Sequence, residues 1–409
     1  MKNKFSNRLK NVPFSATMEA THLAQQRINK GLKTIDLGIG GADFNVPNSA
    51  TKKLITIAKK GKAHYTEPQG IKQLRESISK AVKNCYYDEQ NRRTFSLNYS
   101  ANEIIVSPGS KKFIFWTPLI LCNATKQEEV LIHAPYWPPY YDTALIAGAI
   151  PKIINTTEEN KFELKADVLE ENISNKTKLF IFNSPNNPTG NVVSKKNLKK
   201  IANVLLDKNV FVLSDEIYTM HTFNKNKHYS IASIVPEIQE QCIVSNGISK
   251  SYSMAGWRLG YALIKNKQIY NAFIIMASNT ISSASSPIQE ATIELFENAV
   301  ENAKKIRKTM QKRSELAYKR LNELFPETFK PKGSFYIFPK VSEFYGKKIN
   351  GKKIKNSKDF SKALLNEGVS TVWGSAFGKD ENIRFSLVRK TKELEKAFDI
   401  VEQFVNKLK

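Results

Sequence analysis

Short apolar runs that alternate with helical stretches constrain this chain more than any other feature of its sequence. Seven such runs follow residue 101: Ile104–Ser107, Val130–Ala134, Ala149–Asn155, Leu179–Asn183, Val210–Ser214, Cys242–Ser245 and Leu259–Ile264. Helical patterns separate them, near residues 111–123, 138–147, 166–173, 194–207 and 266–277. Strands that are apolar throughout must be covered on both faces. The alternation therefore predicts an α/β fold with a mostly parallel, seven-stranded sheet between two layers of helices.

The two ends of the chain predict a second, smaller domain of the α+β class. At 409 residues the chain is too long for one small core, and 41% hydrophobic with 25% charged residues is typical of a globular protein. Further apolar runs lie near the C-terminus, at Phe335–Phe338, Val369–Trp373 and Ile383–Val388. Helically spaced apolar residues predict a long bridging helix at about 287–324. We expect a large domain at residues 48–287, and a small domain made of residues 14–47 and 288–409.

The formal net charge of +25 raises the question of a nucleic-acid partner. Only 11 of the 63 basic residues are Arg, and the lysines are dispersed over helical faces. No helix-turn-helix, zinc-finger or RNA-binding motif accompanies the charge. We therefore expect a solvated, lysine-rich surface and no nucleic-acid partner. An Arg inside an apolar segment of such a chain is expected to meet a geometric need that Lys cannot.

The sequence predicts no membrane segment and no metal site. The longest apolar run, Phe113–Cys122, is too short to span a bilayer, and the N-terminus lacks the apolar region of a signal peptide. Three widely spaced cysteines make no disulfide framework, which favours a reducing compartment, most simply the cytoplasm. The histidines do not share a metal-ligand spacing. They are His22, His64, His133, His221 and His228.

Residues that can bind a ligand follow several predicted strands, at the edge where ligands of parallel sheets gather. After the first strand, Gly109, Ser110 and Lys111 open a helix, which suits a phosphate but is also an ordinary turn. Trp137 follows the second strand on a proline-rich loop, where it can stack on a flat ring or fill a core. Asn187 follows a later strand in a turn of Asn, Pro and Gly residues.

Charged and hydroxyl groups follow the next two strands. Asp215 comes directly after VFVLS, so we expect this buried carboxylate to have a cationic partner, and Tyr218 lies three residues on. Lys250 follows the apolar stretch CIVSNGIS, and Arg258 stands eight positions later. A lysine at the end of a buried strand can form a Schiff base with a carbonyl cofactor, or it can hold a phosphate. The sequence around it leaves both options open.

Together these groups match the needs of pyridoxal phosphate. Its aldehyde needs the amine of Lys250, and its ring nitrogen needs an anion, for which Asp215 is suited. Its ring oxygen needs the donors Asn187 and Tyr218. Its phosphate needs the N–H groups at the helix start and the guanidinium of Arg258. If Arg258 binds the phosphate, Lys250 is left for the aldehyde.

The sequence resembles the fold-type I pyridoxal-phosphate enzymes, in particular the class I/II, aspartate aminotransferase-like enzymes. The motifs occur in family order over about residues 35–390, with 28 residues from Asn187 to Asp215 and 35 more to Lys250. They are YTEPQGIKQLR (65–75), SPGSKKF (107–113), APYWPPY (134–140), NSPNNPTG (183–190), SDEIY (214–218), GISKSYSMAGWRLG (247–260), PKGSFYIF (331–338) and GSAFG with NIRFSL (374–387).

The resemblance implies further roles. Arg384 occupies the position of the family arginine that binds the substrate α-carboxylate, and Gly40 that of a backbone contact to the same group. Tyr65 matches a tyrosine that reaches the phosphate from the neighbouring subunit, which implies a homodimer with shared active sites. Ser249 falls in the segment that contacts the phosphate. The chain departs from the family at Gly41-Ala42, where Glu-Pro is frequent, and at Gly247, where some relatives have serine.

The implied reaction is transamination between an L-amino acid and a 2-oxo acid, with an imine at Lys250 and the freed amine as proton shuttle. The same framework serves carbon–sulfur β-lyases and related eliminating enzymes, which is the alternative. A non-catalytic nucleic-acid-binding protein on this fold is a remote alternative, since all the cofactor partners are present. The donor can be acidic, aromatic or small and neutral. Lys111 favours an acidic side chain, although packing in the phosphate loop explains it equally well.

Overall fold

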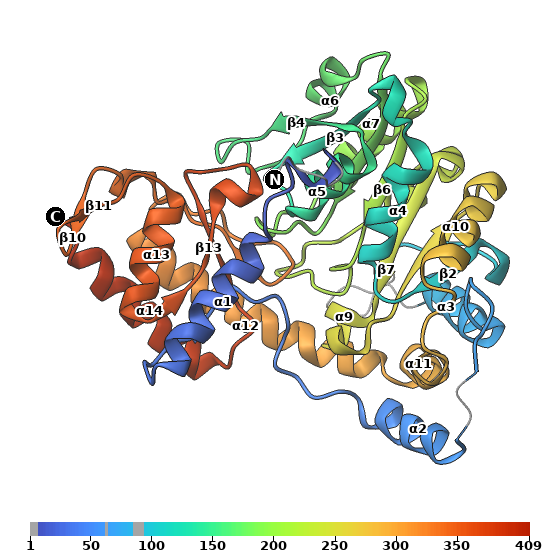
Figure 1. The fold of residues 1–409 in the computed structure, drawn as a ribbon, viewed down its shortest axis with the longest axis horizontal. Coiled ribbons are helices and arrows are strands. Elements are labelled where there is room, and N and C mark those ends of the chain that lie inside the picture. The colour runs from blue at the N-terminus through green and yellow to red at the C-terminus, as the bar shows by residue number, and fades with distance from the viewer. Residues whose placement is uncertain (1–6, 62–63, 85–93) are drawn as a thin grey trace, which may run out of the picture.

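A seven-stranded sheet lies at the centre of the larger part of the molecule (Figure 1). The computed structural model describes residues 7–61, 64–84 and 94–409. The strand order is β2-β8-β7-β6-β5-β3-β4, and all strands are parallel except β8. This confirms the predicted mostly parallel, seven-stranded sheet. The strands are β2 (Ile104–Ser107), β3 (Glu129–Ala134), β4 (Ile150–Asn155), β5 (Thr177–Asn183), β6 (Phe211–Asp215), β7 (Cys242–Gly247) and β8 (Gly260–Ile264).

Helices cover both faces of this sheet, because successive residues of each strand point to opposite sides. Val212 packs into the core on one face, and its neighbour Leu213 packs into the core on the other. The first face is covered by α3 (Lys72–Asn84), α6 (Ala166–Asn172), α7 (Lys195–Asp207), α8 (Ile231–Ile234) and α11 (Ser286–Asn298). The second is covered by α4 (Lys111–Leu121), α5 (Pro139–Ala147) and α10 (Lys267–Thr280).

A smaller group of strands and helices has its own apolar core, which includes Leu37, Phe360 and Phe398. Its strands form a parallel pair and an antiparallel sheet of order β13-β14-β9. These strands are β1 (Ile35–Asp36), β9 (Tyr336–Ile337), β12 (Val369–Ser370), β13 (Val372–Trp373) and β14 (Ile383–Ser386). The helices are α1 (Ala16–Asn29), α13 (Ser357–Glu367) and α14 (Thr391–Asn406). The N-terminal strand β1 thus pairs with a strand from the C-terminal region.

The bridging helix predicted over 287–324 is two helices. α11 ends at Asn298, and α12 (Val300–Leu324) begins after Ala299, whose φ of −118° and ψ of 15° are not helical. α11 packs on α3 and on α2 (Asn48–Lys59), whereas α12 packs on α14 and β9. Apolar periodicity continues across Ala299 because both helices bury a face, so the sequence pattern did not reveal the break.

A hairpin of β10 (Lys348–Ile349) and β11 (Lys352–Lys353) turns at Asn350 and Gly351, both with positive φ. The sequence analysis did not identify this hairpin, although Asn-Gly is its usual turn. Within residues 7–61, 64–84 and 94–409, no helix is long and apolar enough to cross a membrane.

Candidate active site

The predicted site residues gather at one edge of the large sheet, where the parallel strands end. β5 and β6 end side by side, with Asn183 paired to Asp215, and β7 ends beside them at Gly247. β8 runs the opposite way, so its first residue, Gly260, pairs with Gly247 and with Ser107. The antiparallel direction of β8 therefore places Arg258 at the same edge as the ends of its neighbours.

Lys250 lies on α9 (Ile248–Ser251), a single helical turn directly after β7. Its Nζ donates a hydrogen bond of 2.5 Å to the carbonyl oxygen of Gly40. It also lies 6.0 Å from the ring centroid of Tyr218 and 5.4 Å from that of Phe335. No carboxylate within the described ranges forms an ion pair with this amine. The amine is thus held by a carbonyl oxygen and two aromatic faces, and a carbonyl compound can reach it without breaking a salt bridge.

Asp215 ends β6 as a buried carboxylate with two donors. The hydroxyl of Tyr140 donates to its Oδ2 at 2.7 Å, and the backbone N–H of Ile217 donates to Oδ1 at 3.2 Å. Burial raises the pKa of Asp215 to about 6, and the Tyr140 hydrogen bond opposes this rise. The cationic partner that the sequence analysis expected is not among the described side chains that contact it. A ligand cation would favour the ionised form of this carboxylate.

The neighbouring Glu216 does not join Asp215 in an acid pair. Its carboxylate accepts hydrogen bonds from Ser214 at 2.9 Å and Ser230 at 2.6 Å, and its Oε2 lies 3.3 Å from His228 Nε2. Successive strand residues point to opposite faces, which gives the two acids separate partners. Only Asp215 faces the group of predicted site residues.

Arg384 is buried, with 1% of its surface exposed, and it bonds only to neutral groups among the described residues. One Nη donates to Asn187 Oδ1 at 3.0 Å, and the other donates to the carbonyl oxygen of Gly38 at 2.6 Å. The guanidinium carbon lies 4.3 Å from the ring centroid of Tyr336 and 4.9 Å from that of Phe377. A buried guanidinium without an anion is a strong site for a planar carboxylate.

Tyr218 and Tyr336 connect the lysine side of the site to the arginine side. Their hydroxyl groups lie 3.2 Å apart. Burial raises the pKa of Tyr218 well above its ordinary value, so the hydroxyl stays protonated and can donate. Tyr336 packs on Arg384, as described above, and a Cβ on Gly40 would lie 2.7 Å from its hydroxyl oxygen. Both tyrosines thus border the space beside Lys250.

The start of α4 and the guanidinium of Arg258 form a second positively polarised region. Arg258 donates to the carbonyl oxygens of Ala255 at 2.9 Å and Pro108 at 3.4 Å. A Cβ on Gly109 would lie 2.5 Å from an Nη of Arg258, so the backbone approaches the guanidinium as only glycine allows. Ser110 is the N-cap of α4, and its side chain makes no capping hydrogen bond. N–H groups at a helix start beside a guanidinium favour a phosphate.

Of the other predicted residues, Trp137, Lys111 and Ser249 lie beside these site residues, whereas Tyr65 does not. Trp137 packs edge-on against Tyr140, with ring centroids 5.6 Å apart, and Lys111 Nζ lies 5.4 Å from the Trp137 ring centroid. Ser249 precedes Lys250 on α9 and is half-buried. Tyr65 is 86% exposed, and no hydrogen bond or ring contact joins it to the other predicted residues in the described structure. The fold of one chain brings all the predicted residues but Tyr65 to this edge.

Sequence reasoning missed several residues that shape the site. Tyr140 was visible within APYWPPY, but nothing in the motif indicated that it bonds to a residue 75 positions away. Asn183, the last residue of β5, accepts a hydrogen bond from Asn187 N at 2.9 Å and donates to the Asp215 carbonyl at 2.8 Å. Tyr336 stood within PKGSFYIF without a role. These residues lie between the predicted ones and orient them.

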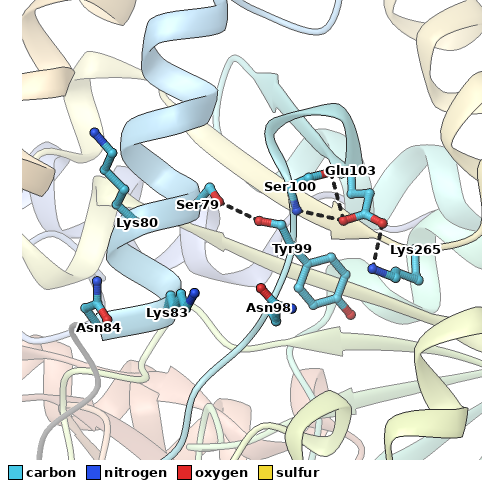
Figure 2. A pocket seen from close by; sticks show the side chains of 9 residues that line it. All are labelled: Ser79, Lys80, Lys83, Asn84, Asn98, Tyr99, Ser100, Glu103 and Lys265. Atoms are coloured by element: carbon cyan, nitrogen blue, oxygen red, sulfur yellow. Dashed lines mark hydrogen bonds and ion pairs between the residues drawn. The ribbon is translucent and has the colours of Figure 1, made fainter.

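A cavity of about 620 Å³ lies elsewhere, between α3 and the segment that leads into β2. Figure 2 shows its lining side chains, with Lys265 paired to Glu103 at 2.7 Å and Ser79 bonded to the Tyr99 carbonyl. The Glu103 carboxylate also accepts from the Ser100 backbone N–H at 2.7 Å. These groups satisfy one another, and the lining includes none of the predicted site residues. The cavity is therefore separate from the candidate active site.

The groups gathered at this edge of the sheet fit pyridoxal phosphate. Lys250 offers an amine without an acidic partner, Asp215 offers a buried carboxylate without a cation, and the start of α4 offers N–H groups next to Arg258. An aldehyde, a ring nitrogen and a phosphate each find a chemically suitable partner among these groups. Such an arrangement defines the class of enzyme that moves amino groups on a carbonyl cofactor.

Comparison with known proteins identifies the family. The model of the family "Aminotransferase class I and II" matches residues 33–401. The chain is 35% identical to an aspartate aminotransferase of Bacillus sp. (strain YM-2), over 99% of this chain and 100% of that protein. It is 36% identical to a probable aspartate/prephenate aminotransferase of Rickettsia prowazekii, over 98% of this chain and 99% of that protein.

Solved structures agree with these matches. The aspartate aminotransferase from Rhizobium meliloti superposes with a TM-score of 0.92 at 27% identity, over all of both chains. The enzyme from Thermus thermophilus with maleate superposes with a TM-score of 0.89 at 26% identity, over 98% of this chain and 100% of that one. The chain belongs to the class I and II aminotransferase family. It is an aminotransferase that acts on amino acids and 2-oxo acids, and the family uses pyridoxal phosphate. The β-lyase alternative is not favoured.

Proposed function

We propose that this enzyme transfers the amino group of aspartate to a 2-oxo acid, using pyridoxal phosphate held by Lys250. The observation that carries the proposal is that Lys250 and Asp215 lie at the ends of adjacent strands, and Arg384 bonds to Asn187 at the same sheet edge. None of the three forms an ion pair with another described residue. An amine, a buried carboxylate and a buried guanidinium without ionic partners are costly to fold. A cofactor and a substrate that supply the missing charges account for all three.

The chain's own residues have two kinds of role: some bind the cofactor, and Lys250 also takes part in the reaction. When bound, pyridoxal phosphate supplies the electron sink that makes the α-proton of an amino acid acidic. The Lys250 amine carries the aldehyde and, once freed, moves that proton as a general base. Asp215 keeps the ring nitrogen protonated, and Asn187 and Tyr218 donate to the ring oxygen. Gly109, Ser110, Ser249, Arg258 and the backbone N–H of Lys111 hold the phosphate, and Trp137 stacks on the ring.

Two cations select a dicarboxylic substrate in this proposal. Arg384 binds the α-carboxylate through parallel N–H donors, with Asn187 and Gly40 beside it. Lys111, whose Nζ lies against Trp137, binds the second carboxylate. Desolvation and nearby Arg258 lower the pKa of Lys111, and Asp142 opposes this effect. The relatives named as aspartate aminotransferases, and the Thermus structure with the dicarboxylate maleate, support this choice.

We also propose a homodimer in which Tyr65 of each subunit reaches the phosphate site of the other. The support is the exposure of Tyr65, at 86%, although its motif belongs to the active site. We further propose a large domain at 48–287 and a small domain at 14–47 and 288–409. The support is a separate apolar core in each part, although Leu295 of α11 packs into the core of the large one. The buried thiols Cys122 and Cys242 are free, which supports a reducing compartment such as the cytoplasm.

Borohydride reduction of the protein with pyridoxal phosphate, followed by peptide mass mapping, tests the cofactor site. We expect the label on Lys250 and none in the Lys250→Ala protein. A panel of amino donors with 2-oxoglutarate tests the reaction, and aspartate is expected to be the best donor. A label confined to other lysines, or no transfer from any donor, contradicts the proposal.

A pair of variants, Lys111→Gln and Lys112→Gln, tests whether Lys111 selects the side-chain carboxylate of the substrate. Lys111→Gln is expected to lower kcat/KM for aspartate by about 10- to 100-fold, the effect of losing a charged hydrogen bond. The rate with alanine is expected to stay the same. Lys112→Gln, the neighbouring lysine on α4, is the matched control. Equal losses of kcat/KM with aspartate and with alanine would mean that the Lys111 side chain belongs to the phosphate loop and does not bind the substrate carboxylate.

A further inference from the structure

His221 lies directly behind the lysine and has no part in the roles described above. It follows Tyr218 by three residues in the turn after β6, and its side chain is fully buried, at 0% exposed. Its Nε2 lies 3.0 Å from the backbone carbonyl oxygen of Lys250. The spacing of the histidines in the sequence did not indicate a role for His221. The structure instead shows it in contact with the backbone of Lys250.

The imidazole of His221 is neutral, with its proton on Nε2. A carbonyl oxygen only accepts hydrogen bonds, so the nitrogen facing it must carry the hydrogen. Burial lowers the pKa of His221 to about 4, and the hydrogen bond to the Lys250 carbonyl opposes this effect. The neighbouring cations Lys250 and Arg307 act in the same direction as burial. Its Nδ1 is buried without a hydrogen-bond partner among the described residues. His221 therefore donates one hydrogen bond, from its Nε2–H to the carbonyl oxygen of Lys250.

The turn that carries Lys250 needs outside support. α9 has only four residues, and a single helical turn is not stable by itself in water. The backbone bonds that close it are long, at 3.3 Å from Tyr252 N to the Ile248 carbonyl and 3.3 Å from Ser253 N to the Lys250 carbonyl. The 3.0 Å bond from His221 is shorter than either. His221 thus makes the shorter of the two hydrogen bonds to the Lys250 carbonyl oxygen.

His221 also joins the Lys250 turn to two other parts of the site. Its backbone N–H donates to the Tyr218 carbonyl at 2.8 Å, and its carbonyl accepts from Ser334 N at 2.8 Å. Its ring packs edge-on against Phe335, with centroids 5.7 Å apart. Phe335 is the same ring that lies 5.4 Å from Lys250 Nζ. One residue therefore connects the Tyr218 segment, the lysine turn and the strand that begins at Tyr336.

We propose that His221 is a positioning residue: its Nε2–H holds the carbonyl of Lys250, so that the amine points at the cofactor aldehyde between Tyr218 and Phe335. The inference rests on the proposed cofactor site at Lys250. The amine condenses with the aldehyde, forming a carbon–nitrogen double bond and releasing one water. Condensation and proton transfer both require this orientation, whereas binding of the substrate carboxylates by Arg384 and Lys111 does not.

Three substitutions separate positioning from packing. His221→Leu keeps an apolar side chain of similar size and removes the donor. His221→Gln places an amide nitrogen near the position of Nε2, and His221→Asn places it only near Nδ1. His133→Leu is the matched control, because His133 is another buried histidine, packed between Phe180 and Phe182 with centroids 6.1 Å away.

The measurements are the rate at which added pyridoxal phosphate becomes covalently linked to the apoprotein, followed by absorbance, and kcat and KM for aspartate. We expect His221→Leu and His221→Asn to slow linkage and lower kcat by about tenfold, the loss of one buried hydrogen bond, with KM unchanged. His221→Gln is expected to recover most of both rates. His133→Leu is expected to match the wild type, and melting temperatures report on folding.

The outcomes distinguish this inference from the proposed function. Wild-type rates in His221→Leu overturn the positioning role while leaving the cofactor site intact. Slow linkage in His221→Leu that His221→Gln does not restore also overturns it, because the loss then follows packing. A wild-type protein that forms no link at Lys250 overturns both proposals.

Discussion

The hydroxyl of Tyr140 donates a hydrogen bond of 2.7 Å to Oδ2 of Asp215, across 75 residues of sequence. This bond favours the ionised carboxylate, against the burial that raises its pKa to about 6. The carboxylate must be ionised to hold a protonated ring nitrogen. The phenol therefore helps to keep the proposed cofactor site active at lower pH.

Tyr140→Phe is expected to raise the pKa of Asp215 further. The acid limb of the pH profile for pyridoxal phosphate affinity should then move to higher pH, by about one unit for a bond of about 1.4 kcal/mol. The affinity is measured by titrating the apoprotein across the pH range. Tyr141→Phe, the adjacent residue on α5, is the control and should leave the limb in place. An unmoved limb in Tyr140→Phe would show that this bond does not control the ionisation.

Asp215→Asn is expected to stabilise the apoprotein at neutral pH while abolishing transamination. The folded-state pKa of about 6 lies above the ordinary 3.8, so the wild type gains stability from this group below about pH 4 and loses it as pH rises through about 6. The full difference corresponds to about 3 kcal/mol. Asn does not titrate. The free energy of unfolding of Asp215→Asn, relative to that of the wild type, should therefore increase between about pH 4 and about pH 7.

Urea unfolding of the two apoproteins at both pH values measures this difference. Asp207→Asn, at the exposed end of α7, is the control for an aspartate-to-asparagine substitution outside the site. A constant difference between Asp215→Asn and the wild type would mean that Asp215 is ionised at both pH values.

Arg384→Lys is expected to raise KM for aspartate and lower kcat/KM by about 10- to 100-fold. Lysine keeps the charge but loses the parallel donors that match a carboxylate, an effect of about 1.5–3 kcal/mol. Steady-state kinetics with varied aspartate measure it. Arg320→Lys is the control, since Arg320 pairs with Asp399 and Glu402 at the surface. Unchanged kinetics in Arg384→Lys would remove Arg384 from the substrate site.

Mixing two inactive proteins tests the shared site. Lys250→Ala and Tyr65→Ala subunits, when exchanged, form heterodimers with one site that contains both native residues. Random exchange should restore about a quarter of the wild-type activity, because about half of the dimers are mixed and each has one native site. Each variant mixed with itself is the control. If mixtures stay inactive after exchange is shown by mass, Tyr65 does not act across subunits.

Gly260→Ala is expected to destabilise the protein by about 1–3 kcal/mol and to weaken pyridoxal phosphate binding. A Cβ there would lie 2.2 Å from the backbone nitrogen of Ser110, at the start of α4. Thermal unfolding and cofactor titration measure the two effects. Gly256→Ala is the matched control, because its Cβ would meet nothing within 4 Å. Equal stability of the two variants would show that the α4 start can move aside.

Much of the site was predictable from sequence because it depends on local order along the chain. A buried strand followed by a polar turn places its ligand-binding residue at the sheet edge, whatever the neighbouring strands do. Asp215, Asn187 and Lys250 each follow this rule, and their motifs carried the family resemblance. The seven-stranded sheet was predictable for the same reason, because each apolar run between helical stretches corresponds to one buried strand.

The tertiary structure decided how residues distant in sequence meet. It set β8 antiparallel, which brings Arg258 to Gly109, and it joined Arg384 to Asn187 across 197 positions. It also placed Tyr140 on Asp215 and His221 behind Lys250. Strand direction and side-chain partners of this kind depend on the packing of several elements at once. The sequence by itself therefore determined which chemical groups stand at the strand ends, and the packing of the whole chain determined which of them contact one another.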